Sequence, residues 1–176
     1  MKIIDNPLPG VVLIDKVKFE DSRGVMVKTF HEPTFKSLGL ETNFKECIFN
    51  ISYKNSFRGM HYQTGEDAHD KVIHVINGDI LDIVLNINKD SKAFGKFFST
   101  VLSSSNNYSL YMSKDYAHGM FVLSDIAIVS YMTTKVFNEK TYAGVRWDSF
   151  GFNWPDYSNN PILNERDKLL PELGSL

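Results

Sequence analysis

The sequence predicts an all-β fold, a sandwich or barrel of jelly-roll type with a few short helices. Short runs rich in β-branched and aromatic residues recur along the 176 residues, and turn residues separate them. Almost no stretch shows the apolar periodicity of an amphipathic helix. The clearest strand, residues 79–88, alternates and places four apolar side chains on one face: Leu81, Ile83, Leu85 and Ile87.

The first third of the chain contains three predicted strands, a turn and one short helix. Residues 32–39 carry Pro33 near the start and Gly39 just past the end, which is typical of a single short helix. The predicted strands are Val11 to Phe19, Val25 to Phe30 and Cys47 to Tyr53, with a turn at Asp21-Ser22-Arg23-Gly24.

A hexapeptide, Arg58-Gly59-Met60-His61-Tyr62-Gln63, places a guanidinium, an imidazole, a phenol and an amide between two apolar β-rich runs. A segment that only filled a core would not need all four groups. Gly59 inside a strand pattern indicates a β-bulge, which would turn Arg58 and His61 to the same side. An edge strand with its polar residues in solvent is the alternative for each residue taken alone.

The middle of the chain is predicted to form a hairpin whose second strand belongs to the wall of a barrel that holds a ligand. Lys71 to Ile76 forms a strand that ends at Asn77-Gly78, a pair typical of hairpin turns, and residues 79–88 return from it. The second face of the returning strand is mixed, with Asp82 and Asn86 on either side of Val84, which suits a barrel wall. Further predicted elements are strands at Phe97 to Leu102, Ser109 to Met112, Met120 to Leu123 and Ala127 to Thr134, and a short helix from Asn164 to Leu170.

Length and charge restrict the function. Residues 1–176 are most simply one domain. Nineteen Lys and Arg against twenty-one Asp and Glu give a net charge of -2, so no long-range field favours nucleic acid or an anionic membrane. The single cysteine, Cys47, fits a reducing cytosol, and we expect a cytoplasmic protein. No signal peptide is recognised in residues 1–10, and no apolar run approaches the roughly 20 residues of a membrane span.

Five histidines are candidates for chemistry, and a structural role is the starting interpretation for each. His31 and His74 are expected to be structural, and His69 to be solvated in a polar loop. His118 stands beside Gly119 at a predicted loop-to-strand junction, so function and structure are equally supported there. His61 belongs to the polar hexapeptide and gains weight if other segments supply partners.

The inventory of reactive groups points to acid/base chemistry without a metal or cofactor. The His-x-His pair with a nearby Glu that is usual for metal sites in small β-barrels is missing, because Tyr62-Gln63 follows His61. The chain also lacks a glycine-rich phosphate loop and an evident serine or cysteine nucleophile. What remains is proton transfer by His, Lys, Tyr and Asp, which suits proton abstraction next to a carbonyl. An unperturbed imidazole pKa of ~6.5 makes histidine the natural base.

The ordered set of motifs resembles the dTDP-4-dehydrorhamnose 3,5-epimerase family, metal-free cupins that act on nucleotide-linked 4-keto-6-deoxysugars. The resemblance covers nearly the whole chain. Its strongest pieces are Asp21-Ser22-Arg23-Gly24, Arg58-Gly59-Met60-His61-Tyr62-Gln63, Lys71, Ser91-Lys92-Ala93-Phe94-Gly95, Ala117-His118-Gly119-Met120, Trp154-Pro155 and Asn164-Glu165-Arg166-Asp167. The resemblance implies a cupin jelly-roll, a homodimer and no cofactor.

The resemblance also implies roles for individual residues. His61 matches the general base, Asp167 the carboxylate that orients it, Lys71 the cation facing the C4 oxygen and Tyr131 the acid on the opposite face. Without the family pattern, Tyr131 would be a barrel aromatic and Asp167 a helix cap. The residues expected to bind the substrate are Arg23, Arg58, His118, Asn50, Gln63, Lys28, Tyr142 and Arg166; the arginines suit pyrophosphate.

Five positions depart from the family pattern: Lys28, Ile48, Val136, Phe137 and Tyr142. In the family these positions lie toward the nucleotide and the sugar, whereas the catalytic set is kept. The resemblance therefore implies unchanged chemistry on a changed substrate, and a GDP-linked 4-keto-6-deoxyheptose is our hypothesis beside the thymidine-linked hexose. Inversion at C3, C5 or both is left open.

Two other functions are alternatives. A nucleotide-sugar 3,4-ketoisomerase is a related cupin that moves the carbonyl, but the set of Lys71, Tyr131 and Asp167 argues against it. A non-catalytic cupin that only binds nucleotide-sugars would bind tightly without exchanging a carbon-bound proton with solvent.

Overall fold

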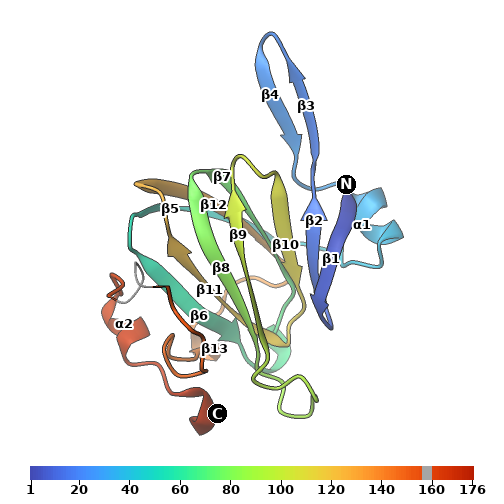
Figure 1. The fold of residues 1–176 in the computed structure, drawn as a ribbon. Coiled ribbons are helices and arrows are strands. Elements are labelled where there is room, and N and C mark those ends of the chain that lie inside the picture. Colours follow the sequence, from blue (N-terminus) through green and yellow to red (C-terminus); the bar gives the residue numbers. More distant parts are fainter. Residues whose placement is uncertain (156–159) are drawn as a thin grey trace.

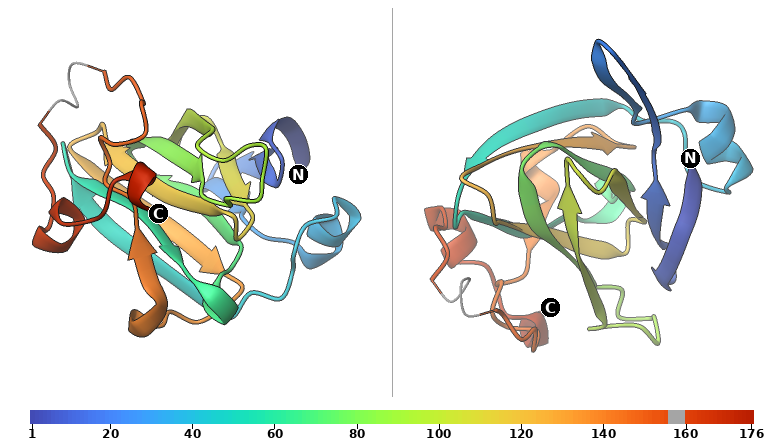
Figure 2. Two further views of the ribbon diagram at one scale, coloured as in Figure 1. Left: turned by 90° about the horizontal axis from the view of Figure 1, so that it is seen from below. Right: turned by 45° about the horizontal axis from the view of Figure 1, so that its top comes forward.

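The computed structural model of the chain is a jelly-roll in which two antiparallel sheets face each other (Figures 1 and 2), and it describes residues 1–155 and 160–176. The first sheet has six strands in the order β1-β2-β10-β7-β12-β5. These are β1 (Lys2–Leu8), β2 (Val11–Asp15), β10 (Tyr108–Met112), β7 (Lys71–Asn77), β12 (Ile126–Thr133) and β5 (Glu46–Tyr53). The all-β prediction is confirmed.

The second sheet has five strands in the order β13-β6-β11-β8-β9, and a separate two-stranded hairpin projects from the barrel (Figure 1). The strands of the five-stranded sheet are β13 (Tyr142–Gly144), β6 (Phe57–Gln63), β11 (Tyr116–Val122), β8 (Asp79–Asn86) and β9 (Phe97–Ser103). The hairpin consists of β3 (Val17–Asp21) and β4 (Gly24–Lys28).

Helical structure is confined to short pieces, as predicted. α1 (Glu32–Ser37) carries proline at its start and ends before Gly39, which has a positive φ of 72°. α2 (Glu165–Lys168) is capped by the side chain of Asn164. Three-residue 3-10 turns lie at Gly65–Asp67, Glu139–Thr141 and Leu173–Ser175. None of the helices in the described residues is both long and apolar enough to cross a membrane.

Apolar side chains fill three layers. The layer between the two sheets includes Ile73 and Val129 from the first sheet and Val84 from the second. A second layer covers the outer face of the second sheet, where Ile83 packs with residues of the C-terminal segment such as Phe150. The third layer lies under α1. The alternation predicted for residues 79–88 is confirmed, because Leu81, Ile83 and Leu85 share the outer layer whereas Val84 faces the interior.

The N-terminal part of the prediction needs two corrections. Val11 to Phe19 is not one strand, because the chain leaves the first sheet after Asp15 and enters the projecting hairpin at Val17. Between them the buried Lys16 donates a hydrogen bond from Nζ to the carbonyl of Tyr108. Lys2–Leu8 forms an edge strand that the sequence did not indicate, and an edge is where a strand tolerates its Pro7.

The predicted hairpin at Asn77-Gly78 is wrong. β7 pairs with β10 and β12 in the first sheet, whereas β8 pairs with β11 and β9 in the second. Gly78 has a φ of 80°, and a Cβ built there would lie 2.3 Å from the carbonyl oxygen of Ile126. The glycine is therefore needed for a tight turn, but this turn carries the chain from one sheet to the other.

The predicted bulge in β6 is confirmed. His118 in β11 pairs with His61, but Met120 pairs with Arg58, so one extra residue of β6 is accommodated between the two pairs. A Cβ on Gly59 would lie 2.4 Å from the Cα of Gly119, so the two backbones approach closely at this point.

We expect Gly119→Ala to destabilise the fold. Its Cβ would lie 2.6 Å from the sulfur of Met60 and 2.8 Å from the ring of Phe57, and overpacking of this kind costs roughly 1–3 kcal/mol. The measurement is the free energy of unfolding in urea. Gly174→Ala is the matched control, because its Cβ would meet no heavy atom within 4 Å. Equal stability of the two variants would contradict the prediction.

Candidate active site

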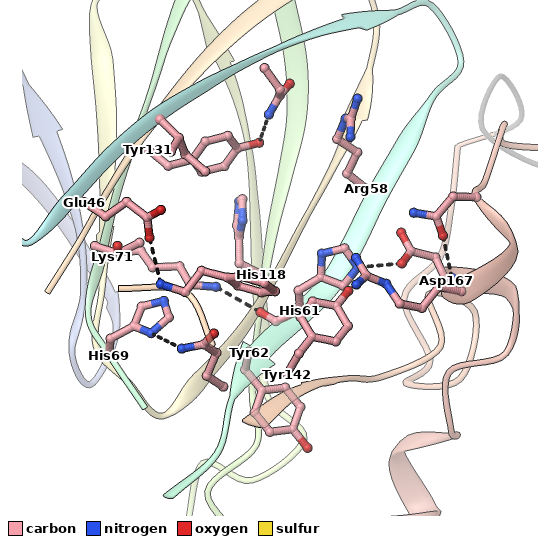
Figure 3. Close-up of a pocket in the computed structure, with 17 residues that line it drawn as sticks. Glu46, Arg58, His61, Tyr62, His69, Lys71, His118, Tyr131, Tyr142 and Asp167 are labelled. Atoms are coloured by element: carbon pink, nitrogen blue, oxygen red, sulfur yellow. Dashed lines mark hydrogen bonds and ion pairs between the residues drawn. The ribbon is translucent and has the colours of Figure 1, made fainter. Parts of the chain in front are cut away.

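A cavity of about 310 Å³ opens between the two sheets and α2, and it contains most of the predicted site (Figure 3). The residues that line it are Glu46, Ile48, Asn50, Arg58, His61, Tyr62, Gln63, His69, Lys71, His118, Tyr131, Thr133, Phe137, Tyr142, Asn164, Arg166 and Asp167. Ten of the twelve predicted site residues are among them. The two that are absent are Arg23 and Lys28.

The register of the first sheet arranges one wall of the cavity in rows. Thr133 of β12 lies between Glu46 of β5 and Lys71 of β7, so these three residues form a polar row. The next inward-facing row has Tyr131 between Ile48 and Ile73. Residues directly opposite each other in neighbouring strands share a face, which explains why segments distant in sequence meet here.

His61 and Asp167 form a pair on the opposite wall, which the second sheet and α2 supply. His61 Nε2 lies 2.8 Å from Asp167 Oδ1, and the Asp167 side chain is only 1% exposed. Burial lowers the pKa of His61, although Asp167 acts against this effect. The imidazole is therefore neutral near pH 7. With Nε2–H donated to the carboxylate, Nδ1 is left as a proton acceptor.

Lys71 brings a buried ammonium between the two walls. Its Nζ donates a hydrogen bond of 3.1 Å to the carbonyl of His61. Burial lowers the pKa of Lys71 to about 8, and the negative charge of Asp82 opposes the shift. The side chain is thus mostly cationic at pH 7, and its partial removal from water strengthens its interaction with neighbouring charges.

Tyr131 faces the cavity from the first sheet, and its hydroxyl is held by a polar chain. Arg58 Nε donates to Ser52 Oγ at 2.8 Å, Ser52 Oγ donates to Asn50 Oδ1 at 2.8 Å, and Asn50 Nδ2 donates to the Tyr131 hydroxyl at 2.8 Å. Burial raises the pKa of Tyr131 well above its ordinary value. The phenol remains protonated and retains a proton to donate.

His118 occupies a different setting from the one predicted. It lies inside β11 rather than at a loop-to-strand junction, and it is buried between β6 and β8. Its Nε2 lies 2.7 Å from Asp82 Oδ2, and Asp82 is completely buried. Asp82 was not predicted as a site residue. The signal was present, since a carboxylate stood on the mixed face of an otherwise apolar strand.

Arg58, Arg166 and Tyr142 complete the side of the cavity near Asp167. The guanidinium carbon of Arg166 lies 3.9 Å from the centre of the Tyr142 ring, and Tyr142 contacts the His61 ring with centroids 5.1 Å apart. Within the described part of the chain, neither arginine forms an ion pair with a carboxylate. Two guanidiniums are thus available to an anionic ligand.

Arg23 and Lys28 lie outside the cavity because both belong to the projecting hairpin (Figure 1). Arg23 is 88% exposed and forms an ion pair of 2.6 Å with Asp21. The hydrogen bond from Arg23 lowers the pKa of Asp21. Within one chain, these two residues therefore do not meet the other ten.

Gln63 and His69 also differ from expectation. The Gln63 amide oxygen accepts from Asn138 N and its nitrogen donates to the Asp67 carbonyl, so the amide is used to hold the loops. His69 was expected in solvent but lines the cavity and donates from Nδ1 to the Asp67 carbonyl at 2.8 Å. Other lining residues that were not predicted as site residues are Glu46, Tyr62, Thr133 and Asn164.

In residues 1–155 and 160–176, no group of three or more His, Cys, Asp or Glu side chains could hold a metal ion. The groups present can accept a proton at His61, donate one at Tyr131 and stabilise a negative oxygen at Lys71.

Comparison with known proteins identifies relatives along the whole chain. The chain is 33% identical over 179 residues to the dTDP-4-dehydrorhamnose 3,5-epimerase of Escherichia coli (strain K12), covering 100% of this chain and 96% of the relative. It is 31% identical over 170 residues to the enzyme of the same name from Methanothermobacter thermautotrophicus, covering 95% and 91%.

Solved structures of related enzymes superpose closely on this chain. The Bacillus anthracis dTDP-4-dehydrorhamnose 3,5-epimerase with TDP and PPi bound superposes with a TM-score of 0.93 at 28% identity, covering 97% of this chain and 98% of that one. The Legionella pneumophila dTDP-6-deoxy-D-glucose-3,5-epimerase in complex with dTDP-4-keto-L-rhamnose has a TM-score of 0.93 at 25% identity, covering 98% and 93%.

The family model described as dTDP-4-dehydrorhamnose 3,5-epimerase matches residues 5–175. The fold prediction of a cupin jelly-roll is thereby confirmed, as is assignment to the isomerases that epimerise carbohydrates. Because of this match and these relatives, the chain belongs to the dTDP-4-dehydrorhamnose 3,5-epimerase family.

Proposed function

We propose that this protein inverts C3, C5 or both of a nucleotide-linked 4-keto-6-deoxysugar by proton transfer through an enolate. The observation that carries the proposal is the position of the base and the acid. His61 belongs to the second sheet and Tyr131 to the first, and both face one cavity that also contains the Lys71 ammonium. Inversion needs a base and an acid on opposite faces of a carbon, and two facing sheets supply them.

The first step removes a proton from the carbon next to the ketone. His61 Nδ1 takes the proton, and the electrons of the broken C–H bond form an enolate whose oxygen is stabilised by Lys71. Loss of one such donor costs roughly 3–4 kcal/mol in barrier. Asp167 stabilises the imidazolium that forms.

The second step returns a proton to the other face of the same carbon. The enolate collapses to the ketone as the carbon takes the hydroxyl proton of Tyr131, and solvent later restores that proton. The 2.8 Å hydrogen bond from Asn50 stabilises the phenolate while it lasts. The raised pKa of Tyr131 makes the phenolate short-lived, because it is readily reprotonated.

The substrate is proposed to be linked to a nucleoside diphosphate. Arg58 and Arg166 supply planar cations beside the catalytic pair, and guanidinium groups suit phosphate oxygens. The relatives that hold TDP, pyrophosphate and dTDP-4-keto-L-rhamnose support the same class of ligand. A product of this class would supply deoxysugars for surface polysaccharides.

The nucleotide and the sugar length are the finer part of the proposal. Relatives named for dTDP-4-dehydrorhamnose favour the thymidine-linked hexose. Three of the five departures from the family pattern, Ile48, Phe137 and Tyr142, line the cavity and can alter its specificity, whereas Lys28 and Val136 do not line it. The guanosine-linked heptose therefore remains our hypothesis for an alternative substrate.

A homodimer is also proposed, because one chain leaves apolar surface uncovered. On the hairpin, Phe19 is 50% exposed and Met26 62% exposed. On β5, alternate residues Phe49, Ile51 and Tyr53 are each more than half exposed, at 65%, 52% and 68%. Apolar surface of this extent marks an interaction site. A second copy could also bring the hairpin that carries Arg23 and Lys28 to the cavity.

We expect Tyr131→Phe and His61→Asn to separate the two proton transfers. In D2O, Tyr131→Phe should still exchange the C3 or C5 proton at His61 but should lose inversion, whereas His61→Asn should lose both. A positioned acid or base contributes typically 10²–10⁴-fold. Proton NMR with a thymidine-linked 4-keto-6-deoxyhexose and a guanosine-linked 4-keto-6-deoxyheptose reports exchange, inversion and preference together.

Other outcomes of that NMR experiment point elsewhere. Binding of both substrates without exchange by the unaltered protein would leave a nucleotide-sugar-binding cupin. Movement of the carbonyl to C3 would indicate a 3,4-ketoisomerase. Inversion at an unchanged rate in Tyr131→Phe would remove the tyrosine from the mechanism.

The pH profile of turnover should be bell-shaped. Burial lowers the pKa of His61 below 6.5, so the neutral base is present above that value and activity falls in acid below it. Lys71 loses its proton as the pH rises through about 8, so activity falls again there. Asp82→Asn removes the charge that raises the pKa of Lys71 and should move the basic limb to lower pH, whereas the exposed Asp90→Asn should not.

Ile51→Glu should convert the proposed dimer into a monomer, because it places a charge in the apolar surface of β5. Light scattering after gel filtration measures the mass, with twice the chain mass of 20.1 kDa expected for the unaltered protein. Val101→Glu on β9 is the control, since Val101 is also exposed, at 44%, but lies in the other sheet. A monomeric unaltered protein would contradict the proposal.

A further inference from the structure

The cavity is electrically asymmetric. Figure 3 shows Arg58 and Asp167 at one side, whereas Glu46 and His69 lie at the other side with Lys71 near them. Arg166 lies against the Tyr142 ring, so both guanidiniums belong to the first side. A carboxylate repels phosphate, so Glu46 opposes a diphosphate at its own side. The diphosphate therefore takes the arginine side, and Glu46 meets the uncharged part of the sugar.

Glu46 is positioned with one oxygen available. Its Oε2 accepts a 2.8 Å hydrogen bond from the backbone N–H of Phe137, which fixes the carboxylate against the loop after β12. Among the described residues, no hydrogen bond or ion pair uses Oε1, and Lys71 is separated from Glu46 by the intervening strand β12. A fixed carboxylate oxygen that faces a cavity is a strong hydrogen-bond acceptor.

His69 presents a second acceptor. Its Nδ1 lies 2.8 Å from the carbonyl oxygen of Asp67, and a carbonyl only accepts, so Nδ1 carries the hydrogen. Nε2 is therefore an acceptor in the neutral ring. Burial, together with the nearby charge of Lys71, lowers the pKa of His69, so the ring is neutral near pH 7. Glu46 acts on the same ring in the opposite direction, as expected for neighbouring groups.

We propose that Glu46 and His69 form a subsite that recognises a hydroxyl on the C3 or the C5 side of the sugar's C4 ketone, an inference that rests on the function proposed above. Two acceptors at one side of the cavity, with the donor Lys71 near them, suit a hydroxyl that donates a hydrogen bond beside a carbonyl that accepts one. A methyl group at this place would remove water from the carboxylate without replacing its hydrogen bonds, which is unfavourable.

Two sugar substituents could supply the hydroxyl, because the carbons that carry them, C3 and C5, both flank the C4 carbonyl proposed to face Lys71. One is the C3 hydroxyl, present in hexose and heptose substrates. The other is a hydroxyl on the exocyclic chain at C5, which a 4-keto-6-deoxyheptose carries and a 4-keto-6-deoxyhexose lacks. The subsite thus selects substrates through hydroxyl groups rather than through the nucleotide.

The test uses two substitutions that keep the local hydrogen bonds. Glu46→Gln retains an amide oxygen for Phe137 N but turns the other oxygen into an NH2 donor. His69→Asn places an amide where Nδ1 lies, so it can still donate to Asp67, but it removes the Nε2 acceptor. Glu66→Gln, on an exposed residue of the loop between β6 and β7, is the matched control.

Three substrates distinguish the sources of the hydroxyl: a thymidine-linked 4-keto-6-deoxyhexose, its 3-deoxy analogue and a guanosine-linked 4-keto-6-deoxyheptose. The readout is kcat/KM, with solvent deuterium entering at C3 or C5. We expect Glu46→Gln to lose roughly 10- to 100-fold on a substrate that carries the recognised hydroxyl, and His69→Asn to lose less. Loss on the hexose but not on its 3-deoxy analogue assigns the C3 hydroxyl. Loss on the heptose alone assigns the exocyclic one.

Two results would overturn the inference while leaving the proposed function intact. One is an equal loss on all three substrates, which would show a general effect on the site. The other is no loss beyond that of Glu66→Gln. Absence of C3 or C5 exchange by the unaltered protein on every substrate is a different result, because it removes the proposed function and the subsite with it.

Discussion

The hydrogen-bonded pair of His61 and Asp167 is the interaction on which the site depends. It joins residues 106 positions apart and connects the C-terminal α2 to β6 of the barrel. A buried carboxylate without partners would be costly, so its partners hold the segment in place. Asn164 caps α2 by accepting from the backbone N–H of Asp167, which fixes the residue itself. One contact therefore sets the tautomer of the proposed base and closes one side of the cavity.

The jelly-roll explains how the two residues of the proposed mechanism reach opposite faces of one carbon. A side chain in either sheet that faces the interior also faces the other sheet, so β6 and β12 present His61 and Tyr131 toward a common space. Register then determines the neighbours. The row of Glu46, Thr133 and Lys71 follows from pairing of β5, β12 and β7, and a shift by one residue would turn all three side chains outward.

Local pattern predicted the class of fold, the bulge in β6 and both helices, because each depends on residues close together in the chain. It failed where pairing is non-local. Asn77-Gly78 has the chemistry of a tight turn, but turn chemistry does not determine which strands pair, and the flanking strands joined different sheets. The strand at residues 2–8 was missed because an edge strand needs no strict apolar alternation.

In the candidate site, too, local sequence pattern predicted some residues, whereas others depend on contacts that are distant in the chain. His61 could be recognised as a candidate from its segment, but the roles of Lys71, Tyr131 and Asp167 came only from the family pattern, since each alone resembles a structural residue. Glu46 and His69 had no such pattern. The first began an apolar strand and the second lay in a polar loop, and only the pairing of β5 with β12 and the hydrogen bonds of the loop bring them to the cavity. Arg23 and Lys28 fitted the pattern but lie on the hairpin.

The proposed proton transfer also requires that Lys71 remain positively charged inside the barrel. Burial strengthens the interaction of an ammonium with a developing enolate, but it also favours loss of the proton, and the pKa of Lys71 falls to about 8. Asp82 limits that fall while it also pairs with His118, so a single buried carboxylate supports two residues of the site. Among the described residues the ammonium forms no ion pair, so in the proposed mechanism it is available to the ketone oxygen of the substrate.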